Sequence, residues 1–115
     1  MRTLENVHYV SPGDRALLRE VKRTIQALLP GATVLLYGSV ARSAQGPESD
    51  YDILVLSEAA LTRSEKDAVR DAIFDLEMER DVAISTLFYA KSQWDTPLYR
   101  AMPLHEQIDR DAILV

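Results

Sequence analysis

The most constraining part of this sequence is LLYGSVARSAQGPESDYDILVL, residues 35–56. Two apolar runs enclose a Gly-Ser turn, Gly38-Ser39, and two aspartates one residue apart, Asp50 and Asp52. The runs TVLLY and YDILVL are short, apolar and partly β-branched, which predicts two buried strands. Alternate residues of a strand project from the same face, so we expect the side chains of Asp50 and Asp52 to point the same way.

Helical patterns flank these strands. Apolar positions from Leu17 to Leu29 recur at helical spacing, after the turn residues SPGD and before Pro30-Gly31, which predicts a helix. Thr62 and Glu65 fit a capping box, in which each residue satisfies a free backbone donor at a helix start. That helix is expected to end near Arg80.

The remaining elements are shorter. We expect a short helix starting over residues 40–43, a turn at AQGPES, a third strand at VAISTLFY and a helix around LHEQIDRD, before the apolar end ILV. The order is helix, strand, short helix, strand, helix, strand, helix. This order predicts an α/β (α+β) fold with a small mixed β-sheet flanked by helices.

Length and composition restrict the class of protein. The 115 residues suffice for a single domain, residues 1–115, without a separate substrate domain. The net charge of −5 argues against an extensive surface for duplex nucleic acid. There is no cysteine, which excludes disulfides and thiolate zinc sites. The polar start MRTLENVHYV and the lack of an apolar run of ~20 residues predict a cytoplasmic protein that does not cross a membrane.

The opening stretch combines residues that bind metal with residues that bind phosphate. Asp50 and Asp52 supply hard oxygen ligands, which favour Mg²⁺ over zinc. Gly38 allows a tight turn, and Ser39 with the first amides of the following helix offers donors to phosphate oxygens. This combination favours phosphoryl or nucleotidyl transfer. A P-loop hydrolase is excluded because the chain has no GxxxxGK[ST] motif.

The segment GSVARSAQGPESDYDILVL resembles the signature of the DNA polymerase β superfamily of nucleotidyltransferases. Chain length and the Gly-Ser-x-Ala-Arg form are similar to its minimal (MNT) branch, which includes MntA-like antitoxins. The resemblance implies that Gly38 and Ser39 hold the triphosphate of ATP and that Asp50 and Asp52 bind Mg²⁺ in a two-metal site. A hydroxyl group would then attack the α-phosphate in line, and pyrophosphate would leave. Arg42 either steadies the phosphates or forms an exposed salt bridge.

The chain departs from the family pattern at two places. Ser43 stands where the family usually has glycine, and a serine fits there if its φ is negative. The family also expects a third carboxylate on the strand after the long helix, and the apolar pattern aligns that position with either Asp81 or Ala83. If the position is Ala83, Asp81 lies ~6.6 Å further along the strand. Asp81 is the predicted third catalytic and metal-binding residue; without it, nucleotide binding could persist without turnover.

The resemblance also implies a partner. Minimal members typically act with a small helical HEPN-type protein, as toxin–antitoxin pairs, and in such pairs the antitoxin can transfer AMP onto the partner. Specificity in so small a domain must lie in a partner or homodimer interface. Two hypotheses follow: a Mg²⁺-dependent nucleotidyltransferase that modifies a protein, and a catalytically impaired, nucleotide-binding antitoxin or interaction module.

Overall fold

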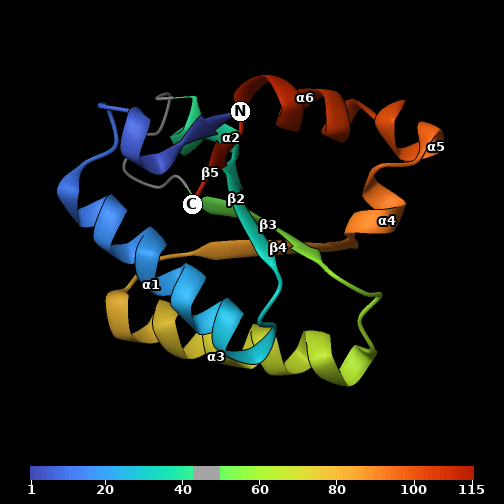
Figure 1. Ribbon diagram of the computed structural model, residues 1–115. Helices are drawn as coiled ribbons and strands as arrows, with labels where there is room; N and C mark the ends of the chain where they lie inside the picture. Colours follow the sequence, from blue (N-terminus) through green and yellow to red (C-terminus); the bar gives the residue numbers. More distant parts are fainter. Residues whose placement is uncertain (43–49) are drawn as a thin grey trace.

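A computed structural model describes residues 1–42 and 50–115 of the chain (Figure 1). The turn expected at AQGPES, and Ser43, lie outside the described residues. The helices are η1 (Leu4–Asn6), α1 (Pro12–Leu28), α2 (Gly38–Ala41), α3 (Arg63–Arg80), α4 (Lys91–Trp94), α5 (Pro97–Arg100) and α6 (Pro103–Asp111). The strands are β1 (Arg2–Thr3), β2 (Thr33–Tyr37), β3 (Tyr51–Ser57), β4 (Ile84–Ala90) and β5 (Ile113–Leu114).

The described strands form one mixed sheet in the order β1-β5-β2-β3-β4. Strand β3 is antiparallel to β2 and parallel to β4. In this register Asp52 of β3 is paired with Tyr37 of β2 on one side and with Ser85 of β4 on the other. The long helix α3 is the crossover between the parallel strands β3 and β4, as a parallel pair requires. The fold class is therefore the predicted α+β arrangement of a mixed sheet flanked by helices.

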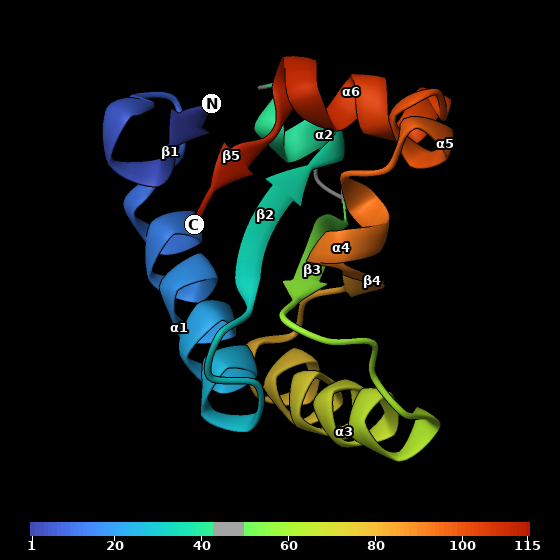
Figure 2. The ribbon, with the colours of Figure 1, turned by 45° about the vertical axis from the view of Figure 1, so that its right-hand side comes forward.

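Helices cover both faces of the sheet (Figure 2). Helices α1 and α3 pack on one face, where α1 contributes Leu18 and Val21 and α3 contributes Val69 and Ile73 to the larger core. Helices α4 and α6 cover the other face, and side chains of alternate sheet residues, such as Leu35 and Leu54, pack with them. Since Asp52 and Leu54 are two residues apart on β3, Asp52 belongs to this second face.

The long helices begin as the sequence predicts. The Ser11 hydroxyl accepts a hydrogen bond from Asp14 N at the start of α1. At the start of α3, Thr62 Oγ1 accepts from Glu65 N over 3.1 Å and Glu65 Oε1 accepts from Thr62 N over 3.0 Å. Both bonds of the capping box are thus present, and α3 ends at Arg80 as expected.

Some local predictions need correction. The short helix begins at Gly38 itself rather than at residue 40, because Tyr37 is still extended and occupies the N-cap position. The third strand begins at Ile84 rather than at residue 82, because Asp81 takes a left-handed conformation at the end of α3.

Trp94 is buried and stacks on His105 at a ring distance of 4.3 Å. It therefore belongs to the core beneath α4 and α6.

None of the helices described in residues 1–42 and 50–115 is both long and apolar enough to span a bilayer.

Candidate functional site

The turn between β2 and α2 strongly favours glycine. Gly38 has φ = +76°, a region that L-residues rarely adopt. A Cβ atom at Gly38 would lie 2.1 Å from Oδ2 and 3.0 Å from Cγ of Asp52. The backbone of the turn therefore packs directly against the Asp52 carboxylate, and the Gly-Ser and Asp-x-Asp motifs form one site.

Helix α2 presents backbone donors at this point. The first N–H groups of any helix lack partners within the helix. The N-cap residue Tyr37 makes no capping hydrogen bond through its side chain, and Ser39 is half-buried in the first turn of α2. The amide donors of α2 and the Ser39 hydroxyl therefore lie next to Asp52, which is the β3 partner of Tyr37.

The two aspartates interact with each other. Asp50 is exposed and directly precedes β3, whereas Asp52 is the half-buried second residue of β3. Burial raises the pKa of Asp52, and the negative charge of Asp50 raises it further, while the Arg42 guanidinium acts in the opposite direction. The structure thus brings Asp50, Asp52 and Arg42 within electrostatic range of one another, beside Gly38.

This pair fits a divalent cation. A raised pKa means that the second negative charge is unfavourable in the site as it stands, and a bound cation would relieve the repulsion. The carboxylate oxygens are ligands that Mg²⁺ prefers. Among the described residues, however, no group of three or more His, Cys, Asp and Glu side chains is arranged to hold a metal ion. The donor set therefore fits one ion held by two carboxylates together with oxygens of a ligand.

Asp81 is placed outside this group. It caps the C-terminus of α3 with φ = 53° and ψ = 52°, its side chain is exposed, and its backbone N–H bonds to Glu77 O. The structure therefore does not gather Asp81 with Asp50 and Asp52 into a three-carboxylate set, and the catalytic role of Asp81 stays a prediction.

The strand register shows which residues of the β4 segment lie beside the acid pair. Ser85 is the neighbour of Asp52. The Tyr51 N–H donates to Ala83 O over 3.0 Å, which continues the ladder so that Ala83 is level with Asp50. Partners in a parallel pair share a face, and neighbouring strands lie ~4.8 Å apart. The two positions from which a third acid would reach the pair carry Ala83 and Ser85.

Aromatic side chains line the same face of the sheet. Burial raises the pKa of the Tyr37 hydroxyl, and Asp52 and Tyr89 raise it further. Tyr89 contacts Trp94 at a ring distance of 5.2 Å and Tyr99 at 5.6 Å. The sequence analysis did not single out Tyr37 as a site residue. The signal was present, because alternation along TVLLY places Leu35 and Tyr37 on one face.

Tyr51, between the two aspartates, points to the opposite face. Its hydroxyl donates a hydrogen bond to Asp14 Oδ1 in the first turn of α1. Burial and this hydrogen bond raise the pKa of Tyr51 to about 12, so the hydroxyl remains protonated at neutral pH and continues to donate. The start of β3 is therefore fixed to α1 on one face while its acids remain available on the other.

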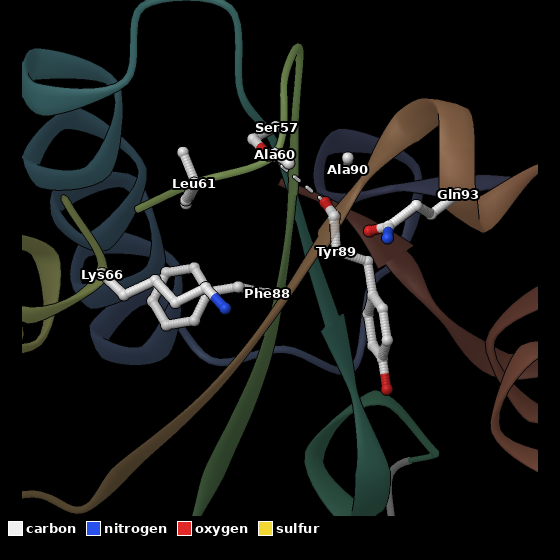
Figure 3. Close-up of a pocket in the computed structure, with 8 residues that line it drawn as sticks. All are labelled: Ser57, Ala60, Leu61, Lys66, Phe88, Tyr89, Ala90 and Gln93. Carbon is white, nitrogen blue, oxygen red and sulfur yellow. Dashed lines mark hydrogen bonds between the residues drawn. The ribbon is translucent and has the colours of Figure 1, made fainter. Parts of the chain in front are cut away.

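A separate cavity lies at the other end of β3 and β4 (Figure 3). It has a volume of about 160 Å³ and is lined by Ser57, Ala60, Leu61, Lys66, Phe88, Tyr89, Ala90 and Gln93. Ser57 ends β3, whereas Asp52 is near its start. Five strand residues span roughly 17 Å, so this cavity is not part of the acid site.

A glycine-serine turn packed against an Asp-x-Asp strand, on a mixed sheet flanked by helices, defines a nucleotidyltransferase-type domain. The comparisons agree with this class. The chain belongs to the nucleotidyltransferase domain family, whose family model matches residues 18–106.

One relative supports this membership, and one solved structure shares the fold. A protein of Methanocaldococcus jannaschii that is provisionally named a protein adenylyltransferase is 31% identical over 78 residues, covering 66% of this chain and 79% of the relative. A solved structure described as the crystal structure of a toxin–antitoxin with AMP-PNP matches with a TM-score of 0.60. That match covers 84% of this chain and 69% of the other chain at 16% sequence identity, so it shows a common fold. The chain is thus a nucleotidyltransferase similar to minimal members of the family.

Proposed function

We propose that this protein is a Mg²⁺-dependent nucleotidyltransferase that transfers AMP from ATP to a hydroxyl group of a protein partner. The observation that carries this proposal is the contact between Gly38 and Asp52, where a Cβ atom would meet the carboxylate at 2.1 Å. The phosphate-binding turn and the metal-binding acid are built as one unit. Nucleotidyl transfer needs the two close together, because Mg²⁺ held by the carboxylates would neutralise the charge of a triphosphate held by the turn.

Each residue has a separate role in this proposal. The α2 amides after Gly38 and the Ser39 hydroxyl donate to phosphate oxygens, and the Arg42 guanidinium neutralises phosphate charge. Asp50 and Asp52 would hold Mg²⁺, which supplies charge neutralisation for the triphosphate when bound. The acceptor oxygen forms a bond to the α-phosphorus, the bond to the bridging oxygen breaks, pyrophosphate leaves, and the hydroxyl proton passes to solvent.

The proposed partner is a small helical protein of the HEPN type, with this chain as the antitoxin of the pair. Two comparisons support it: one relative is provisionally named a protein adenylyltransferase, and a structure of the same fold is described as a toxin–antitoxin with AMP-PNP. The alternative to such a partner is a homodimer, whose interface would then determine the specificity for the acceptor.

A second candidate function is favoured by the β4 register. Because Ala83 and Ser85 are the residues beside the acid pair, the site supports nucleotide binding better than it supports activation of the attacking hydroxyl. In this reading the chain is a nucleotide-binding antitoxin with little or no turnover. Asp81 could complete the metal site only if the segment before β4 shifted, since Mg²⁺ needs its ligands at ~2.0–2.1 Å.

One experiment separates the two candidates. The protein is incubated with ATP labelled at the α-phosphate, Mg²⁺ and the product of the neighbouring gene, and label on that product is measured. Transfer by the wild type, its loss in Asp50→Asn and its loss on chelation are expected for the enzyme. A matched control is Asp95→Asn, because Asp95 is an exposed acid whose only described ion pair is a 3.9 Å contact with Arg100.

Retained labelling in the Asp50→Asn variant would end the first proposal. Saturable binding of Mg²⁺-ATP with no labelled product would favour the second candidate. Absence of both binding and transfer would refute both.

A further inference from the structure

The amino-terminal residues contact α2 at the end opposite Gly38. Arg2 Nη2 donates a hydrogen bond to Ala41 O over 3.1 Å, and the Tyr9 hydroxyl donates to the same oxygen. Arg2 also contacts Tyr9: its Nη1 lies 2.7 Å from the Tyr9 hydroxyl oxygen, and its guanidinium carbon lies 5.9 Å from the centre of the Tyr9 ring. Ala41 is the last residue of α2, so two donors converge on its C-terminal carbonyl.

The same guanidinium contacts a second helix end. Arg2 Nη2 also donates to Asp111 O, and Asp111 is the last residue of α6. Figure 1 shows the amino terminus beside α2 and α6. A helix C-terminus carries partial negative charge, which a cation stabilises. Arg2 therefore joins the C-terminal ends of α2 and α6 through a favourable electrostatic contact at each.

Helix α2 needs such external contacts to keep its orientation. It has four residues, and isolated helices shorter than ~12–15 residues are marginal in water. Its own backbone contributes a hydrogen bond from Arg42 N to Gly38 O over 3.2 Å. Val40 and Ala41 are buried in the core beside β2 and β3, which fixes one side of the helix. Arg2 and Tyr9 hold its C-terminal end.

We propose that Arg2 and Tyr9 are positioning residues for the nucleotide site. They hold α2 at its C-terminal end so that the amides at its N-terminal end face the triphosphate. This inference rests on the proposed function of Gly38 and Ser39. Neither Arg2 nor Tyr9 needs to touch the nucleotide. Loss of either contact lowers the fraction of molecules in which α2 has the binding orientation, and the apparent Kd rises by the inverse of that fraction.

The test compares Arg2→Ala and Tyr9→Phe with the wild type, using a fluorescent ATP analogue with Mg²⁺ to measure Kd. Tyr9→Phe keeps the ring and removes only the hydroxyl donor. Arg63→Ala is the matched control, because Arg63 is 94% exposed and pairs with Asp67 at 3.9 Å, remote from α2 in the fold. We expect Kd to rise about tenfold in Arg2→Ala and about threefold in Tyr9→Phe, as the competent population falls. Arg63→Ala should bind as the wild type does.

A second measurement needs no nucleotide. Hydrogen exchange of the amides in residues 38–42 should be faster in Arg2→Ala than in the wild type, while exchange in α3 should be unchanged. Wild-type affinity in both variants, or unchanged exchange in α2, would overturn the proposal. Faster exchange across the whole sheet with a matching loss of Tm would overturn it too, because it would indicate a general structural role. If the wild type binds no ATP analogue, the proposed function fails and this inference fails with it. If the wild type binds the analogue but the variants show unchanged affinity or unchanged exchange in α2, this inference alone fails.

Discussion

Replacing Gly38 with alanine tests the contact that joins the proposed phosphate-binding turn to Asp52, the proposed metal ligand. At φ = +76° an alanine is strained, because its Cβ crowds the following carbonyl oxygen, at a cost of about 1–2 kcal/mol. The new Cβ would also lie 2.1 Å from Asp52 Oδ2, so the carboxylate must rotate out of its position. An off-rotamer side chain costs about 0.5–1.5 kcal/mol. The free energy of unfolding should therefore fall by about 1.5–3.5 kcal/mol in total.

A double-mutant cycle separates the two contributions. In an Asp52→Ala background the atoms Oδ2 and Cγ are absent, and only the approach to the residue-52 Cβ at 3.2 Å remains. Gly38→Ala should then cost only the backbone strain of about 1–2 kcal/mol. The coupling free energy should be about 0.5–1.5 kcal/mol, measured by urea unfolding followed by circular dichroism. An equal cost of Gly38→Ala in both backgrounds would refute the claim that the turn packs on the carboxylate.

Three further predictions concern stability and turnover. Burial and Asp50 raise the pKa of Asp52 above its ordinary value of 3.8, so ionisation of Asp52 destabilises the metal-free fold as pH rises through the folded pKa. Asp52→Asn should therefore be more stable than the wild type at pH 7 without metal, and urea midpoints that differ equally at pH 3 and pH 7 would contradict this. Ala83→Asp should supply a carboxylate level with Asp50 and increase labelled AMP transfer over the wild type, and transfer that stays unchanged would exclude position 83 as that of the missing acid. Thr62→Ala should lower the free energy of unfolding by about 1 kcal/mol through loss of the α3 N-cap, with Thr62→Ser as the conservative control, and equal stability of the two variants would argue against the cap.

Much of the fold could be predicted because the signals are local. The periodicity from Leu17 to Leu29, the capping residues Thr62 and Glu65, and the two apolar runs each depend on a few neighbouring residues. The fold and family expectations drawn from residues 35–56 were confirmed. Contacts between residues distant in the sequence could not be predicted in the same way. The Arg2 contact with Ala41 spans 39 positions, and no pattern within either segment indicates it.

The position of the third acid shows the same limit. From the sequence, Asp81 and Ala83 were equal alternatives because both can lie on one face of an extended strand. The structure places Asp81 at the end of α3 with a positive φ, so the alternation of a strand does not apply to it. The position at which a helix ends depends on which residue can adopt the left-handed conformation, and aspartate is among the residues that tolerate this conformation. Local chemistry at the helix end therefore places Asp81 outside the strand, which the strand pattern alone did not indicate.

The two-acid site separates binding from turnover in physical terms. Holding Mg²⁺-ATP requires ligands for the ion that accompanies the triphosphate, and in the proposed function Asp50 and Asp52 with the α2 donors would supply them. Activating the acceptor requires a further carboxylate near the attacking oxygen, and the β4 register offers Ala83 and Ser85 at the adjoining positions. Any rate that this protein achieves must then come mainly from positioning and charge neutralisation, which are the dominant contributions in phosphoryl transfer. Binding of Mg²⁺-ATP without turnover, slow transfer of AMP, and transfer of AMP increased by Ala83→Asp are therefore the outcomes that this one site allows.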